Sequence, residues 1–179
     1  MIDLNNSYEI ILTENQIKDK VSELGKQITL DYKDKDLAVI GILKGSVLFF
    51  ADLIRAIELG ITVDFMKVSS YNGQMSSSGR INVISDCSIE LEGKDILLVE
   101  DIIDTGATSG YLIEKLKSKN TRSVKICALL NKKNAEAEGR RIKIDYYIGF
   151  DVPDKFLIGY GLDYKEKYRN LPYIAALIN

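Results

Sequence analysis

The sequence contains no histidine and has few cysteines or prolines, two of each among 179 residues. Without histidine, the Ser-His and Cys-His pairs of nucleophilic catalysis are excluded. Cys87 and Cys127 form no C-x-x-C pair and are too few for a zinc site, so we expect reduced thiols in the cytoplasm. Any metal is therefore expected to be a hard cation bound by oxygen.

The chain also lacks a strong net charge and a long apolar run. Its formal net charge is -2 and its isoelectric point is about 5.3, so the basic surface that drives nucleic-acid binding is not expected. No apolar run approaches the length of a membrane span. Residues 1–10 lack the basic start and apolar run of a signal peptide. We therefore expect a cytoplasmic protein that binds neither nucleic acid nor membrane.

Strand and helix patterns alternate along the chain, without repeats or low-complexity linkers. With 46% hydrophobic residues, residues 1–179 are expected to form a single domain around one core. Thr13 and Gln16 have the spacing of a capping box, which predicts a helix after residue 13. The alternation predicts an α/β fold, a mostly parallel sheet covered by helices on both faces. The expected strands are 37–43, 61–68, 96–99, 124–130 and 146–150, and the further helices are 46–59, closed by Gly60, and 107–116.

The most informative segment is LLVEDIIDTGATS at 97–109, an apolar strand that ends in carboxylates and turns into a helix. In parallel sheets, ligands lie beyond the carboxyl ends of the strands. Backbone N–H groups of 105–109, with the hydroxyls of Thr105, Thr108 and Ser109, are expected to form an anion cradle at a helix N-terminus. The segment therefore predicts a site for a phosphate monoester.

Carboxylates flank this cradle. Glu100 and Asp101 are suited to hold ribose hydroxyls and Mg²⁺, and Asp104 to handle a proton on a nitrogen heterocycle. The alternative for Asp104 is a helix N-cap. A strand ending in Glu-Asp is also typical of P-loop NTPases, but the segment GILKGS at 41–46 lacks the G-x-x-x-x-G-K-[ST] spacing, and we reject that function.

Residues 99–108 resemble the phosphoribosyl pyrophosphate (PRPP) signature of type I phosphoribosyltransferases, specifically of the hypoxanthine-guanine branch, and the resemblance extends over most of the chain. It implies the fold of that family, a mostly parallel twisted sheet flanked by helices with a small hood formed by the chain ends. It further implies that Glu100 and Asp101 contact the ribose hydroxyls, that Asp104 is the general acid/base at purine N7, and that Thr105, Gly106, Ala107 and Thr108 bind the 5′-phosphate.

Within residues 99–108, Ala107 departs from the family pattern, because some relatives carry a long side chain there, but the backbone cradle is kept.

Two other segments match functional loops of this family. Leu43, Lys44 and Gly45 match the pyrophosphate loop, in which the resemblance implies a cis peptide between Leu43 and Lys44. Outside this pattern, Lys44 would be read as a solvated lysine.

A polar, glycine-bearing stretch at 70–79 resembles the closing lid of the family. Ser70 and Tyr71 would fold over the reactants and exclude water, which competes with the purine for the sugar. The alternative is a hairpin without function.

The purine pocket is expected near the C-terminus. By resemblance, Lys132 donates to the exocyclic oxygen of the base, Phe156 stacks on its ring, and the Leu157 backbone reads its edge. Asp163 would help bind a second magnesium, and Arg169 would face pyrophosphate, which its forked guanidinium fits. Taken singly, Lys132 would be a solvated side chain and Phe156 a core residue.

The resemblance implies a magnesium-dependent enzyme of purine salvage, which transfers the phosphoribosyl group of PRPP to hypoxanthine or guanine and gives IMP or GMP and pyrophosphate. The Mg²⁺ ligands would be Glu100, Asp101 and Asp163. Two alternatives stay open: a transferase that prefers xanthine, and a non-catalytic regulator of the same fold that senses nucleotides. A homodimer or homotetramer is expected, because relatives self-associate and the helix after residue 46 carries apolar residues such as Phe49 and Phe50.

Overall fold

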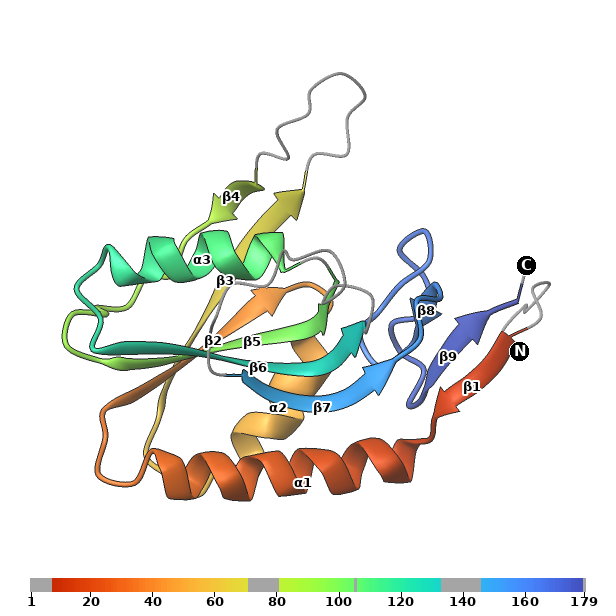
Figure 1. The fold of residues 1–179 in the computed structure, drawn as a ribbon, viewed down its shortest axis with the longest axis horizontal. Helices are drawn as coiled ribbons and strands as arrows, with labels where there is room; N and C mark the ends of the chain where they lie inside the picture. Colours follow the sequence, from red (N-terminus) through yellow and green to blue (C-terminus); the bar gives the residue numbers. More distant parts are fainter. Residues whose placement is uncertain (1–7, 71–80, 105, 133–145, 179) are drawn as a thin grey trace.

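The computed structural model of the protein describes residues 8–70, 81–104, 106–132 and 146–178. Over these ranges the chain builds a main sheet with helices on both faces and a small separate sheet (Figure 1). In chain order the elements are β1 Tyr8–Leu12, α1 Glu14–Asp31, β2 Leu37–Leu43, α2 Val47–Ala56, β3 Thr62–Ser70, β4 Ile81–Ser85, β5 Asp95–Ile103, α3 Ala107–Lys117, β6 Ser123–Lys132, β7 Tyr146–Val152, β8 Leu157–Ile158 and β9 Ile174–Leu177.

The main sheet has the strand order β4-β3-β2-β5-β6-β7. Its strands are parallel except for β4, which runs antiparallel to β3 at the edge. Helices α1 and α2 cover one face and α3 covers the other (Figure 1). The predicted α/β architecture is thereby confirmed.

Strand β5 lies in the middle of this sheet and is buried on both faces. Leu97 packs in the core under α1 and α2, whereas Leu98 packs in the core under α3. Strand β5 continues to Ile103, further than predicted. Because successive side chains of a strand point to opposite faces, the neighbouring Glu100 and Asp101 face opposite sides of the sheet.

The start of α1 confirms the predicted capping box. The Thr13 hydroxyl accepts from the Gln16 N–H at 3.4 Å, and the Gln16 side chain accepts from the Thr13 N–H at 2.9 Å. Two N–H groups that the helix cannot satisfy internally are paired in this way. The helix turns one face to the core, and the buried residues of that face are Ile17, Val21, Leu24, Gly25 and Ile28.

Helix α2 is shorter than the predicted helix 46–59. It ends at Ala56, and Gly60 does not close it. The chain leaves the helical path there because α1 supplies a hydrogen-bond partner. The Glu58 N–H donates to the hydroxyl of Thr29 on α1 at 3.0 Å. A tertiary contact of this kind leaves no signal in the local sequence.

The small sheet is the predicted hood at the chain ends. Its order is β1-β9-β8, all antiparallel, with Tyr8 opposite Leu177. The first and last strands, β1 and β9, lie side by side there, next to the carboxyl ends of the parallel strands (Figure 1). The hood therefore faces the edge of the sheet where ligands of parallel sheets bind.

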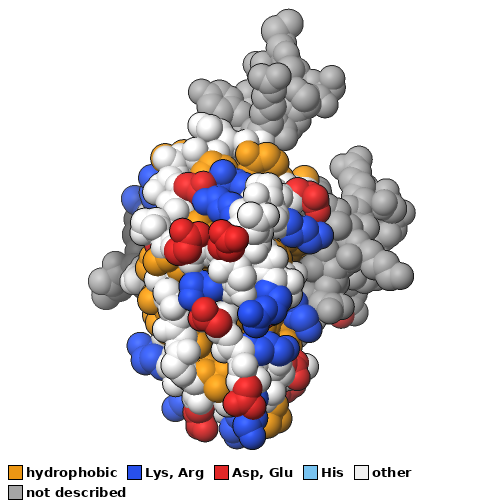
Figure 2. Space-filling model, turned by 90° about the vertical axis from the view of Figure 1, so that its left-hand side faces the viewer, with side chains coloured by type: hydrophobic (Ala, Val, Ile, Leu, Met, Phe, Trp, Pro, Cys, Tyr) orange, Lys and Arg blue, Asp and Glu red, His pale blue; other side chains and the backbone are white. Residues whose placement is uncertain are grey.

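The face turned away from the hood carries acidic and basic side chains close together (Figure 2). The turns before β2, β5 and β6 are joined by such charges: Lys94 Nζ lies 2.6 Å from Asp36 Oδ2, and Arg122 Nη1 lies 3.4 Å from Asp95 Oδ2. Among the described segments, the helices are too short or too polar to cross a membrane.

Candidate active site

A cleft of about 480 Å³ opens between the carboxyl ends of the parallel strands and the hood. It brings together residues that are distant in the sequence, and all of those predicted for the purine and pyrophosphate sites line it. The sheet contributes Leu43, Lys44, Gly45, Asp101, Asp104 and Lys132, and the hood contributes Phe156, Leu157, Asp163 and Arg169.

Some predicted residues do not line this cleft. Glu100 lies behind it, and Gly106, Ala107 and Thr108 lie at the start of α3. Thr105 and Tyr71 lie outside the described residues, and Ser70 is described only as the last residue of β3.

The loop between β2 and α2 is held by internal hydrogen bonds. The peptide between Leu43 and Lys44 is cis, as the resemblance implied. Ser46 is fully buried and its hydroxyl donates to the Ile42 carbonyl at 2.6 Å, while the Val47 N–H donates to the Lys44 carbonyl at 3.2 Å. The loop therefore presents a fixed backbone at the end of the cleft.

Two glycines allow three chain segments to stack at this end. A Cβ atom at Gly45 would lie 1.7 Å from Asp101 Oδ2 on β5. At Gly161 in the hood, where φ is 102°, it would lie 1.9 Å from the Gly45 carbonyl oxygen. Strand, loop and hood meet here at distances that only glycine permits.

The cations at this end are paired with carboxylates of the hood. Lys44 Nζ lies 2.8 Å from Glu166 Oε2, and Arg169 Nη2 lies 2.7 Å from Asp163 Oδ1 and 3.4 Å from Glu166 Oε1. The Arg169 guanidinium also donates to the Gly161 carbonyl at 2.7 Å. Hydrogen bonding to Lys44 lowers the pKa of Glu166. Glu166 was not predicted from the sequence, where its only signal is the spacing of three residues from Arg169.

Asp101 is the carboxylate in the floor of the cleft. Burial raises its pKa to about 6; nearby Asp163 adds to this shift, while backbone N–H groups and Arg169 oppose it. A divalent cation beside Asp101 would favour the ionised form of its carboxylate. Mg²⁺ is usually bound by one or two carboxylates together with substrate phosphates. Asp101 and Asp163 fit that pattern, although the described residues hold no group of three potential ligands.

Glu100 is turned to the opposite face of the sheet, under α3. It is 5% exposed, and its Oε2 accepts from the Ser109 hydroxyl at 2.8 Å. Burial raises the pKa of Glu100 to about 7. The expectation that the Ser109 hydroxyl belongs to the anion cradle is therefore wrong, because a buried carboxylate beneath the helix takes it.

The N-terminus of α3 follows directly on the sheet edge. Its N-cap is Gly106, with φ 75°, and no side chain among the described residues caps it. The N-cap alternative for Asp104 is therefore wrong. Asp104 is instead an exposed carboxylate whose Oδ2 lies 3.8 Å from Lys132 Nζ.

The part of the cleft predicted to bind the purine combines a partly buried lysine with an exposed ring. The Lys132 side chain is 17% exposed, and its Nζ lies 3.0 Å from Asp154 Oδ1. Phe156 is 56% exposed and meets Tyr164 edge-on, with ring centroids 5.7 Å apart. Both single-residue alternatives are wrong, since Lys132 is not freely solvated and Phe156 is not in the core.

Other residues of the cleft were not predicted from the sequence. Lys155 lines it next to Phe156, and its Nζ lies 2.9 Å from Glu9 Oε2 on β1. A lysine beside a predicted base-stacking ring was the available signal. The remaining missed residues are apolar and have no distinctive signal: Ile42, Val68, Ile102 and Leu162.

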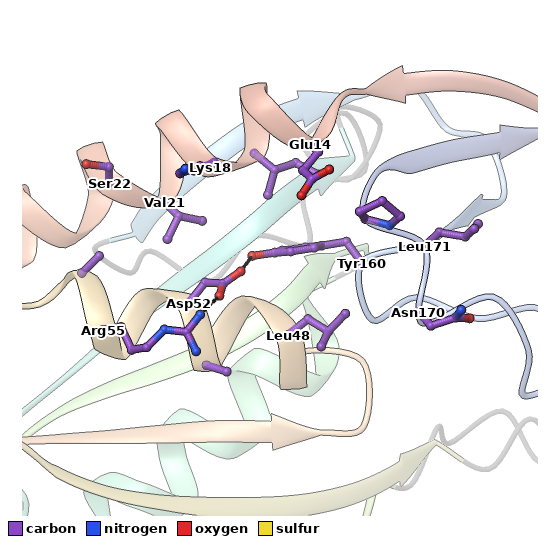
Figure 3. A pocket seen from close by; sticks show the side chains of 14 residues that line it. Glu14, Lys18, Val21, Ser22, Leu48, Asp52, Arg55, Tyr160, Asn170 and Leu171 are labelled. Atoms are coloured by element: carbon purple, nitrogen blue, oxygen red, sulfur yellow. Dashed lines mark hydrogen bonds and ion pairs between the residues drawn. The ribbon is translucent and has the colours of Figure 1, made fainter.

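A second hollow of about 680 Å³ lies between α1, α2 and the hood (Figure 3). The Tyr160 side chain reaches from the hood to Asp52 on α2, and Arg55 pairs with the same carboxylate. None of the residues predicted for catalysis or binding lines this hollow. Its larger volume therefore does not make it the active site.

Comparisons with known proteins point to one family. The phosphoribosyl transferase domain family matches residues 7–165. The chain is 48% identical to the hypoxanthine-guanine phosphoribosyltransferase of Dictyostelium discoideum, with 96% of each chain covered, and 45% identical to that of Staphylococcus aureus strain Mu50, with 97% and 95% covered. The crystal structure of a hypoxanthine phosphoribosyltransferase from Staphylococcus aureus superposes with a TM-score of 0.89, at 44% identity, over 99% of this chain and 95% of the other.

Proposed function

Because this chain belongs to the phosphoribosyltransferase family, we propose that it is a hypoxanthine-guanine phosphoribosyltransferase of purine salvage. It transfers the phosphoribosyl group of PRPP to hypoxanthine or guanine and forms IMP or GMP and pyrophosphate. The relatives at 45–48% identity carry the name of this enzyme, and the chain matches nearly their whole length.

The observation that carries the proposal is the convergence of three kinds of group in one cleft. Lys44 and Arg169 bring positive charge to the cleft, and Asp104 brings an exposed carboxylate 3.8 Å from Lys132. Lys132 and Phe156 add a hydrogen-bond donor and an aromatic face. A diphosphate, a sugar and a purine need these kinds of group in one site.

The residues of the chain act mainly by positioning and charge. Lys44 and Arg169 attract the departing pyrophosphate, and Phe156 and Lys132 orient the base. Asp104 takes the proton from purine N7 while the base attacks the anomeric carbon. No covalent intermediate on the protein is required, so the lack of histidine does not prevent the reaction.

Magnesium is proposed as the cofactor, held by Asp101 and Asp163 together with oxygens of PRPP. When bound, the ion neutralises charge on the diphosphate and so makes it a better leaving group. Glu100 faces α3 and is not among the ligands that the geometry supports.

The test is pyrophosphate release from PRPP and Mg²⁺ with hypoxanthine, guanine, xanthine and adenine offered separately. Turnover with hypoxanthine or guanine is expected. Preference for xanthine would change the assigned base but not the reaction. Lack of turnover with all four bases, in a protein that still binds PRPP, would favour the non-catalytic regulator.

Self-association into a homodimer or homotetramer in the cytoplasm completes the proposal. Phe49 and Phe50, on which this expectation was based, are buried in the core of the chain itself and cannot form an interface. Val47, Val63 and Phe65 are instead apolar and 37–42% exposed around α2, which supports a contact there with a second copy. Sedimentation velocity across a range of concentrations tests this.

A further inference from the structure

Tyr160 joins the hood to α2 by a hydrogen bond. Its ring is 8% exposed within the core under α1 and α2, and its hydroxyl donates to Asp52 Oδ2 at 2.5 Å. Figure 3 shows the Tyr160 side chain crossing the gap from the hood to the helix. Burial and the bond to Asp52 raise the pKa of the Tyr160 phenol, so the group stays protonated and keeps donating.

The backbone of Tyr160 adopts a conformation that a non-glycine residue rarely takes. Its φ is 45°, between Gly159 at 94° and Gly161 at 102°. Left-handed conformations of bulky residues persist only where the surroundings hold them. The Tyr160 N–H donates to the Leu171 carbonyl at 2.8 Å, and the side chain is held at its other end by Asp52.

This turn is in direct contact with the pyrophosphate end of the cleft. Gly161, the next residue, packs its backbone against Gly45, and its carbonyl accepts from Arg169. Helix α2, which carries Asp52, begins two residues after Gly45. The Tyr160–Asp52 bond therefore closes a ring of contacts that runs from the pyrophosphate loop through α2 and the hood turn back to the same loop.

We infer that Tyr160 and Asp52 are positioning residues for the diphosphate of the substrate. They touch no substrate themselves. Their bond fixes the hood turn against the pyrophosphate loop, and so holds Arg169 in place relative to Lys44. The inference rests on the proposed function, because it names the site at which the diphosphate of PRPP binds.

The chain contains a matched control for this bond. Tyr147 on β7 is also buried, at 5% exposure, and its hydroxyl donates to Asp31 Oδ2 at the end of α1 at 2.8 Å. Neither residue lines the cleft. Tyr160→Phe and Tyr147→Phe thus each remove one hydroxyl from a partly buried Tyr–Asp bond, but only Tyr160 is next to the pyrophosphate loop.

Steady-state kinetics of the full-length protein separate the two roles. Tyr160→Phe is expected to raise the KM for PRPP on the order of tenfold and to weaken pyrophosphate binding in calorimetry to a similar degree, with little change in kcat or in the KM for the base. Tyr147→Phe is expected to lower the melting temperature comparably and to leave both constants unchanged. Equal kinetic constants for the two variants would overturn the inference.

A double-mutant cycle adds a second line of evidence. Asp52→Asn keeps an acceptor for the Tyr160 hydroxyl and is expected to stay near the wild-type KM, whereas Asp52→Ala is expected to match Tyr160→Phe. The double variant Tyr160→Phe/Asp52→Ala should show no further rise, because both changes break the same bond. Additive effects would mean that the residues act independently and would overturn the inference.

The same experiments distinguish a failure of the positioning role from a failure of the proposed function. A wild-type protein without turnover on any purine would refute the proposed function. A wild-type protein with turnover whose Tyr160→Phe and Asp52→Ala variants keep the wild-type KM for PRPP would refute only the positioning role.

Discussion

Lys44 and Glu166 stand 122 positions apart in the chain, yet the Lys44 ammonium donates to the Glu166 carboxylate at 2.8 Å across the end of the cleft. The same carboxylate lies 3.4 Å from Arg169. Both cations proposed to face pyrophosphate are therefore already in contact with an anion of the protein. To bind at these two cations as proposed, the diphosphate has to displace Glu166 from them.

Replacing Glu166 with Gln should improve substrate binding. The neutral amide competes less well for Lys44 and Arg169, so we expect the KM for PRPP to fall about two- to fivefold, as for loss of an exposed ion pair. The Glu166 backbone N–H, which donates to Asp163 Oδ2 at 2.9 Å, keeps its partner. Steady-state kinetics at low ionic strength provide the measurement.

Glu23→Gln is the control for this change. Glu23 also forms an exposed lysine pair, with Lys20 at 2.6 Å on α1, outside the cleft. The control should leave the KM unchanged. A KM for Glu166→Gln that rises would show instead that the carboxylate helps to bind the substrate.

Asp104→Asn should abolish most of the catalysis without affecting the fold. A positioned general acid/base contributes about 10²- to 10⁴-fold to a rate, so kcat should fall within that range. The Asp104 side chain is 66% exposed, and loss of its charge should leave the melting temperature nearly unchanged. Stopped or continuous pyrophosphate assays test the rate, and a variant with kcat near wild type would remove Asp104 from the mechanism.

Ser109→Ala should destabilise the protein through Glu100. The change leaves a buried carboxyl without its hydroxyl donor, which costs about 1–3 kcal/mol. Urea unfolding measures this cost. Ser118→Ala, at the exposed C-terminal end of the same helix, removes a hydroxyl that donates to the Lys115 carbonyl and should cost clearly less. Equal losses for the two variants would contradict a special role of the buried pair.

Asp86 should make stability depend on acid pH. Burial acts to raise its pKa, but bonds to Lys115 and Lys119, at 2.9 and 3.1 Å, outweigh it and lower the pKa from 3.8 to about 2. A lowered folded-state pKa stabilises the protein above the unfolded value, and this stabilisation is lost as the pH falls toward 2. Because the Asp86 side chain is 35% exposed, solvent screening limits the effect to about 1 kcal/mol.

Unfolding of Asp86→Asn at several pH values checks this expectation. The free energy of unfolding should be lower than that of wild type at pH 7, and the difference should shrink between pH 4 and pH 2. A difference that stays constant over this range would show that the ion pairs do not cause it.

The fold followed from the sequence because it depends on local patterns, whereas the residues that the hood contributes to the cleft were implied by the family resemblance. The capping box at Thr13 indicates a helix, and the apolar run of β2 indicates a strand, each from a few neighbouring residues. The carboxyl ends of parallel strands then bring Lys44, Asp104 and Lys132 to one edge without knowledge of any tertiary contact.

The errors and omissions have a common physical origin in contacts between distant segments. The end of α2 is set by a hydroxyl of α1, at Thr29, and the hydroxyl of Ser109 is taken up by a carboxylate on the strand below. Glu166 gains its role only because the hood folds back on the loop at Lys44. None of these partners can be identified from spacing along one segment.

The stacked backbones of Gly45 and Gly161 bear on how the substrate range of such a protein can change. A Cβ atom at Gly161 would collide with the Gly45 carbonyl, and one at Gly45 with the Asp101 carboxylate, so side chains are poorly tolerated where the diphosphate is proposed to bind. Phe156 and Lys155, by contrast, are exposed side chains of the hood that can be exchanged without moving the chain. A new base preference can therefore arise there while the handling of PRPP is inherited unchanged.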